Sequence, residues 1–239
     1  MHLHIYKDAE EATIALAKWI TDLIQKTLEV KSSFTIALSG GETPKRLYQI
    51  LASDSFRDKI NWTKLHIFWG DERVVPFNDE NNNAKMAYDN LLCKVDIPAE
   101  QIHKISTDIK PEEAATQYEN ILHQYFDEKQ TTFDLVLLGM GDDGHTLSLF
   151  PGYEISHDDN SWVKAIYSKE KRERITLMPS VVNRSSAVAF LVAGEKKAKV
   201  LQQILEESKR HTYPAQLIQP SNGELHWFVD EAAGKYLKQ

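Results

Sequence analysis

The feature that most limits the fold of this sequence is a regular alternation of short apolar runs with longer segments of helical periodicity. Apolar residues recur three and four positions apart from Ala12 to Ile24, which predicts a helix from Asp8 to about Leu28. Strands are predicted at 34–38, 65–69, 133–138, 174–177, 187–193 and near Trp227, and helices at 44–51, 83–92, 111–125, near 179, at 195–207 and from 230. This order predicts an α/β fold, a mainly parallel sheet with helices on both faces.

Length, composition and charge fit one such unit. The chain has 239 residues, of which 42% are apolar and 26% charged. Because it contains no internal repeat and no long Pro/Gly linker, a single domain over residues 1–239 is expected. Its 28 basic and 35 acidic residues give a formal net charge of −7, which argues against general binding of nucleic acid or of an anionic membrane. A phosphorylated substrate would have to be held by a few placed cations.

Cysteine usage and the first residues predict a cytoplasmic location. Cys93 is the single cysteine, so no internal disulfide can form and a reducing compartment fits. The opening residues MHLHIYKDAEEA lack the apolar core of a secretory signal. The apolar stretches around Val136 and Phe190 are too short to span a bilayer.

Polar motifs follow the predicted strands, where ligands bind in parallel sheets. The first is SGGETP, residues 39–44, between a strand and a helix. Gly40 and Gly41 would let the backbone approach an anion, and the free N–H groups of the helix start would point toward it. Ser39 and Thr43 add hydroxyl donors. The segment predicts a phosphate site, with a plain glycine turn as the alternative. It is neither a Walker loop nor a GxGxxG fingerprint, so nucleotide binding is not indicated.

A second motif, WGDER, spans residues 69–73 and follows another predicted strand. On the functional interpretation, Asp71 orients a substrate hydroxyl or assists proton transfer, and Arg73 binds an anionic oxygen. A solvated charged loop is the alternative interpretation.

The strongest motif is GMGDDGHTLSLFPG, residues 139–152, which follows the buried run 133–138. Dense use of glycine and polar residues is costly for structure alone. A histidine here can accept a proton near neutral pH, which makes His145 the candidate base for activating a water molecule. Asp143 is the candidate group for fixing the orientation and tautomer of His145. A tight turn with a surface histidine is the alternative.

Two further cations are candidates for holding an anion. Arg174 opens a predicted strand, and Lys197 lies at a predicted helix start, where a cation does not benefit from the helix dipole. Both fit better beside a bound anion, although a solvated helix face is an equal alternative for Lys197.

Metal and serine-nucleophile chemistry are not predicted. His2 and His4 alternate as in an edge strand, where a metal site is a minor alternative. The remaining histidines show no metal-ligand spacing, and no metal is expected. Ser148 lies outside a GxSxG elbow, which disfavours a serine hydrolase.

Taken together, the motifs resemble the 6-phosphogluconolactonase family, within the larger glucosamine-6-phosphate deaminase-like, Rossmann-like fold. The matching segments are SGGETP, WGDERVVP, GMGDDGHTLSLFPG, RITLMP, FLVAGEKKA, YPAQLIQP and LHWFVDEAA, and they span 38–233. The resemblance implies a carboxylic ester hydrolase that converts 6-phospho-D-glucono-1,5-lactone to 6-phosphogluconate in the pentose phosphate pathway, without cofactor or metal. A phosphosugar lactone is then the small-molecule partner, and a monomer or homodimer is expected.

The resemblance also assigns roles by position. His145 is similar to the general base, and Asp71 and Arg73 to groups that position the sugar ring. The implied phosphate pocket consists of Ser39, Gly40, Gly41, Thr43, Arg174 and Lys197.

The sequence departs from the family pattern at a few positions. Asp142 stands where proline is common, Leu147 where alanine is usual, and asparagine fills a serine position within 81–83. Two other functions are weighed: a glucosamine-6-phosphate deaminase/isomerase, and a sugar-phosphate sensor without catalysis. The SLFPG segment after His145 favours the lactonase over the deaminase. No basic helix-turn-helix segment supports a DNA-reading sensor.

Overall fold

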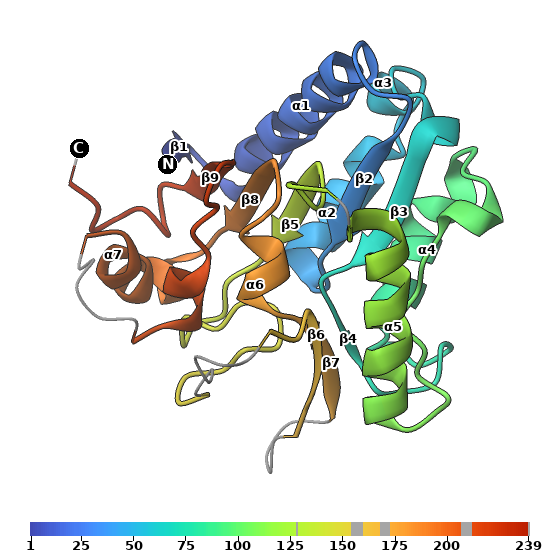
Figure 1. Cartoon of the computed structure of the whole chain (residues 1–239). Coiled ribbons are helices and arrows are strands. Elements are labelled where there is room, and N and C mark those ends of the chain that lie inside the picture. The colour runs from blue at the N-terminus through green and yellow to red at the C-terminus, as the bar shows by residue number, and fades with distance from the viewer. Residues whose placement is uncertain (128, 154–159, 168–172, 207–211, 239) are drawn as a thin grey trace.

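The computed structural model describes residues 1–127, 129–153, 160–167, 173–206 and 212–238 (Figure 1). At its centre is a six-stranded sheet in the order β1-β9-β8-β5-β2-β3, in which every neighbouring pair is parallel. The strands are β1 (His2–Tyr6), β2 (Phe34–Leu38), β3 (Leu65–Trp69), β5 (Leu135–Leu138), β8 (Ala187–Val192) and β9 (Glu224–Asp230). The predicted mainly parallel sheet is confirmed.

Helices connect these strands and cover both faces of the sheet. They are α1 (Ala9–Leu28), α2 (Glu42–Leu51), α3 (Asp54–Arg57), α4 (Asn83–Asn90), α5 (Pro111–Phe126), α6 (Pro179–Val182) and α7 (Ala198–Glu206). The described residues also form the short 3₁₀ turns η1 (Trp62–Lys64), η2 (Leu92–Lys94), η3 (Ala99–Gln101), η4 (Glu195–Lys197) and η5 (Pro214–Leu217). Because parallel crossovers are right-handed, α1 and α2 lie on one face, and α5, α6 and α7 lie on the other (Figure 1).

Local sequence explains why these elements form. The Asp8 side chain accepts a hydrogen bond from the Glu11 N–H, 2.9 Å, which caps α1 as predicted. One stripe of α1 packs into the core, including Leu16, Ile20 and Ile24. All five residues of β2 are buried, as a central strand covered on both faces requires.

A second, three-stranded antiparallel sheet corrects the predicted arrangement. It contains β4 (Asp71–Arg73), β7 (Arg174–Leu177) and β6 (Val163–Ile166), in the order β4-β7-β6. The strand at 174–177 was predicted correctly but does not join the main sheet, and the solvated-loop alternative for Asp71 is wrong. Gly70 bridges the two sheets, because its N–H donates to Leu38 O and its carbonyl accepts from the Leu177 N–H, both 2.8 Å.

Two other segments also differ from prediction. The helix expected from Asp230 is absent from the described residues, because Asp230 ends β9 and its carboxylate accepts hydrogen bonds from the Gly194 and Ala233 N–H groups, which hold turns. The helix predicted at 195–207 begins as the 3₁₀ turn η4 and becomes α-helical at Ala198; its predicted last residue lies outside the described residues.

Between β2 and β5 the chain changes the side of the sheet toward which it adds its next strand. After β2 the chain crosses to β3 on one side, and after β5 it crosses to β8 on the other, although β2 and β5 are neighbours. The loops leaving their carboxyl ends therefore diverge and open a crevice, which is where open α/β sheets bind ligands. Within the described residues, no helix combines the length and the apolar character that crossing a membrane needs.

A buried carboxylate attaches α4 to the second sheet. Glu72 is 1% exposed, and its two oxygens accept hydrogen bonds from the N–H groups of Arg73, Asn83 and Ala84 at 2.7–2.8 Å. Burial raises the pKa of Glu72 to about 7, while the backbone donors act in the opposite direction and Asp71 adds a smaller increase. Glu72 thus fixes the first turn of α4 beside β4.

We predict that Glu72→Gln lowers the free energy of unfolding by about 1–3 kcal/mol at low pH, since its amide NH₂ would face a backbone donor. Between the ordinary pKa of 4.5 and about 7, the folded protein binds more protons at Glu72 than the unfolded chain does. The contribution of Glu72 to stability is therefore present below this window and is lost as the pH rises through it. The stability difference between wild type and variant should shrink between about pH 5 and pH 8, which urea denaturation measures; parallel profiles would contradict this.

Candidate active site

A cavity of about 240 Å³ opens at the carboxyl ends of β2 and β5, in the crevice described above. Nine of the ten predicted site residues line it: Ser39, Gly40, Gly41, Thr43, Asp71, Arg73, His145, Arg174 and Lys197. The tenth, Asp143, contacts His145. The structure therefore brings together segments that are far apart in the sequence.

The turn after β2 presents backbone N–H groups to the cavity. Gly41 precedes α2 with φ 110°, a conformation that glycine adopts without strain, and no side chain caps the helix there. The N–H groups of Glu42 and Thr43 have no partner within this ten-residue helix, and both residues line the cavity. The buried Tyr48 hydroxyl holds the turn, because it accepts from the Ser39 N–H at 3.0 Å and donates to Ser39 O at 2.7 Å.

Asn83 joins three parts of the site and was not predicted as a site residue. Its Nδ2 donates to Asp71 O at 2.9 Å, and its Oδ1 accepts from Arg73 Nη1 at 2.8 Å. A Cβ added to Gly40 would lie 1.8 Å from Asn83 Oδ1, so the glycine is needed for this close approach. Asn83 is 1% exposed and begins α4, the helix predicted at 83–92.

The turn after β5 holds His145. The Gly141 N–H donates to His145 O at 2.9 Å, and a Cβ on Gly141 would lie 2.0 Å from His145 Nδ1, so the ring packs over a bare backbone. Asp143 Oδ1 lies 2.5 Å from His145 Nδ1 and also accepts from the His145 N–H at 3.1 Å. With Nδ1 protonated and donating to this carboxylate, the lone pair of the neutral ring lies on Nε2.

Asp71 is held by a buried serine. Ser148 is 0% exposed and its hydroxyl donates to Asp71 Oδ2 at 2.5 Å. Asp71 Oδ2 also lies 4.0 Å from Arg174 Nη1. The two contacts hold the Asp71 carboxylate between a neutral donor and a cation. The Ser148 hydroxyl is thereby hydrogen-bonded to Asp71.

Leu147 has a strained backbone in the same loop. Its φ of 55° lies in the left-handed region that non-glycine residues rarely adopt, and its side chain lines the cavity. A Cβ on Gly70 would lie 2.7 Å from Leu147 Cδ2, so Gly70 makes room for this side chain. Strain of this kind tends to occur at functional sites.

Three cations converge on the cavity, although the chain as a whole is acidic. The Nε atoms of Arg73 and Arg174 are buried and have no hydrogen-bond partner among the described residues. Burial lowers the pKa of Arg174; Asp71 opposes this shift, and Arg73 adds to it. Burial also lowers the pKa of Lys197, whose ammonium donates to Met140 O and lies 4.0 Å from Asp142 Oδ1. A bound anion would offset the cost of burying these charges.

Part of the β5 turn is already engaged in its own hydrogen bonds. The Gly141 N–H donates to His145 O, and the Gly144 N–H donates to Gly141 O at 3.0 Å. These two N–H groups are directed into the turn, while the Arg73 guanidinium lines the cavity. Among the described residues, the group of three side chains placed to ligate a metal is elsewhere, at β1 and β9.

Comparison with known proteins identifies the family. Residues 7–227 match the model for glucosamine-6-phosphate isomerases/6-phosphogluconolactonase. A 6-phosphogluconolactonase of Synechocystis sp. is 41% identical over 224 residues, which cover 92% of this chain and 91% of that protein. A probable chloroplastic 6-phosphogluconolactonase of Oryza sativa subsp. indica is 37% identical over 98% of this chain and 76% of its own length.

A solved structure of 6-phosphogluconolactonase from Trypanosoma brucei has the same fold. It superposes with a TM-score of 0.86 at 26% identity, covering 99% of this chain and 98% of that one. This chain is a member of the glucosamine-6-phosphate isomerase/6-phosphogluconolactonase family.

Proposed function

We propose that this chain is a 6-phosphogluconolactonase, a carboxylic ester hydrolase that converts 6-phospho-D-glucono-1,5-lactone to 6-phosphogluconate in the pentose phosphate pathway. The observation that carries the proposal is the pairing of His145 with Asp143 in a cavity that also holds three cations. The relatives named as 6-phosphogluconolactonases support it, and the family description covers the isomerase as well.

The proposed chemical step is general-base hydrolysis. His145 Nε2 takes a proton from water while the water oxygen attacks the lactone carbonyl carbon, C1. The bond between C1 and the ring oxygen then breaks, and the proton passes from His145 to the ring oxygen, which becomes the C5 hydroxyl. Asp143 keeps Nδ1 protonated, so that Nε2 is the basic atom and the imidazolium is stabilised.

The remaining side chains divide between the two ends of the substrate. Asp71 and Arg73 position the sugar ring, with Arg73 as the candidate for stabilising the tetrahedral oxyanion. The remote phosphate contributes binding energy that holds C1 beside the water. The proposed phosphate pocket consists of Ser39, Gly40, Gly41, Thr43, Arg174 and Lys197.

A cytoplasmic enzyme that acts as a monomer or homodimer, without a cofactor, completes the proposal. Cys93 is exposed and free, which fits a reducing compartment. The negative net charge fits a small-molecule substrate better than a polyanionic partner.

We predict that His145→Ala lowers kcat by about 10²–10⁴-fold with KM little changed, because the variant loses the base but keeps the phosphate pocket. Lactone hydrolysis is measured on 6-phosphogluconolactone formed in situ, with the spontaneous rate subtracted, and His123→Ala, on α5 away from the cavity, is the control. Wild-type turnover in His145→Ala would remove the base assignment.

The same assay distinguishes the other functions. Release of ammonia from glucosamine 6-phosphate, without lactone hydrolysis, would identify a deaminase. Lactone hydrolysis at the spontaneous rate together with tight binding of 6-phosphogluconate would identify a sugar-phosphate sensor.

We predict that Lys197→Ala weakens binding of 6-phosphogluconate by about 10–100-fold, the effect of losing one hydrogen bond to a charged group. Activity on unphosphorylated gluconolactone should change little, because that substrate lacks the phosphate. Lys196→Ala, an exposed neighbour, is the matched control. Equal calorimetric affinity for Lys197→Ala and wild type would show that Lys197 is not a phosphate ligand.

A further inference from the structure

A second cluster of chemically active side chains lies at the opposite end of the sheet from the cavity. β1 and β9 are parallel and pair in register, with His2 opposite His226. Because side chains alternate along a strand, His2 and His4 of β1 share a face with Glu224 and His226 of β9. These residues lie near the amino ends of the strands, whereas the cavity lies at carboxyl ends.

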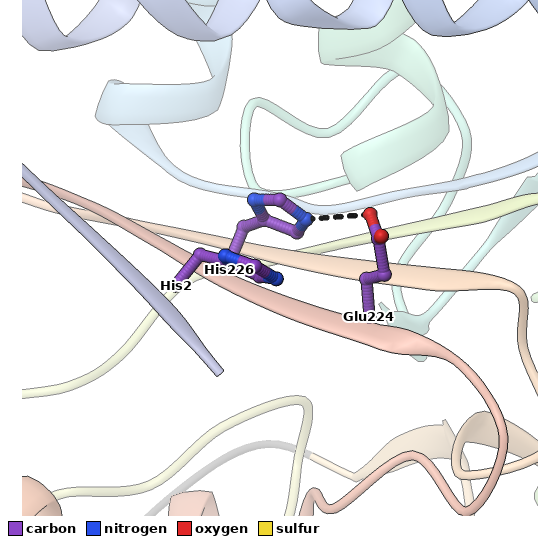
Figure 2. Close-up of side chains that lie close together, drawn as sticks. All are labelled: His2, Glu224 and His226. Carbon is purple, nitrogen blue, oxygen red and sulfur yellow. Dashed lines mark hydrogen bonds and ion pairs between the residues drawn. The ribbon is translucent and has the colours of Figure 1, made fainter.

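The contacts within this cluster bring ligand atoms together. One ligand atom each from His2, Glu224 and His226 lie within 4.8 Å of one another. His226 Nε2 lies 3.0 Å from Glu224 Oε2, the contact drawn in Figure 2, and the His2 and His226 rings stack with centroids 4.6 Å apart. Two imidazoles and one carboxylate form a ligand set typical of protein-bound zinc.

We propose that His2, Glu224 and His226 bind a divalent transition metal, Zn²⁺, which links the edge strand β1 to β9. Zinc lies about 2.0–2.2 Å from nitrogen and oxygen ligands, so tetrahedral ligand atoms are about 3.4 Å apart. The ligand atoms, now within 4.8 Å of one another, would have to move closer together. His2 and Glu224 are exposed, so their side chains can rotate toward the metal. Water completes the coordination.

His4 gives His226 the second contact that a metal-binding histidine needs. His226 Nδ1 lies 3.2 Å from His4 Nε2. When the metal occupies His226 Nε2, the ring proton is on Nδ1 and is donated to His4 Nε2, which fixes the tautomer and the ring plane. His226 is 5% exposed and packs against Trp19 of α1 with ring centroids 4.6 Å apart, so its position is set before metal binds.

The metal site would stabilise the edge strand of the sheet. β1 is at the edge of the sheet, where β9 is its one partner among the described strands, and its residues Leu3 and Ile5 are exposed. A metal that binds the folded state but not the unfolded chain raises stability by mass action. The expected consequence is a stronger β1–β9 pairing, with no part in the chemistry at His145.

The test is a calorimetric titration of chelator-treated full-length protein with Zn²⁺ alone. Wild type should bind one zinc ion per chain, and its melting temperature should rise. His2→Ala and Glu224→Gln alter exposed side chains and should each weaken zinc binding by at least about tenfold. Loss of a residue that only hydrogen-bonds to a metal ligand already lowers metal affinity by about that factor, and these two residues are ligands themselves. His226→Phe keeps an aromatic ring against Trp19 and should abolish this site.

Two further variants sharpen the interpretation. His4→Phe should weaken zinc binding by about 10–100-fold without abolishing it, as expected for an outer contact. His123→Ala removes a histidine far along the chain and should bind zinc as wild type does. Zinc should also slow amide hydrogen exchange in β1 of wild type and of His123→Ala, but not of His226→Phe.

The proposal is overturned if wild type binds no zinc. It is equally overturned if His2→Ala, Glu224→Gln and His226→Phe all bind zinc with wild-type affinity. Lactone hydrolysis by the chelator-treated protein is a separate measurement, so its outcome does not decide the metal site.

Discussion

The pairing of β2 with β5 is the contact on which the candidate active site depends, because it places two diverging loops side by side. The pairing is short, with Ile36 opposite Leu135. Asp134 extends it at the amino end, where its carboxylate accepts from the Thr35 N–H at 2.8 Å and from the Thr35 hydroxyl at 3.0 Å, and pairs with Lys31 at 2.6 Å. These bonds fix the register, and the register fixes which residues of the two loops meet.

Buried polar groups then determine where each strand ends. The Tyr48 hydroxyl bonds both the N–H and the carbonyl of Ser39 after β2, and the Tyr118 hydroxyl does the same for Trp69 at the end of β3, at 2.8 and 2.9 Å. At each point a single side chain satisfies the backbone groups that lose their sheet partners, so the loops leave in a defined direction.

The sequence predicted much of this arrangement, because periodicity and glycine motifs are local signals. It located His145 and Asp71 just after the carboxyl ends of predicted strands, and hence at one edge of a parallel sheet. It did not reveal the second sheet, since three residues at 71–73 are too few for an alternation to be read. Asn83 was missed because its side chain packs against Gly40, 43 positions away, where a Cβ would collide with it. No local sequence pattern indicates a contact between residues so far apart.

The two sites occupy opposite ends of the sheet for different physical reasons. At the carboxyl ends, loops and a helix start supply N–H groups and partly buried cations such as Arg174 and Lys197, whose desolvation an anionic ligand would offset. At the amino ends, the ligands lie on the strands themselves, so their spacing is set by the register of β1 on β9. A site on paired strands suits a metal that stiffens an edge, whereas a site on diverging loops can accommodate a substrate that must enter and leave.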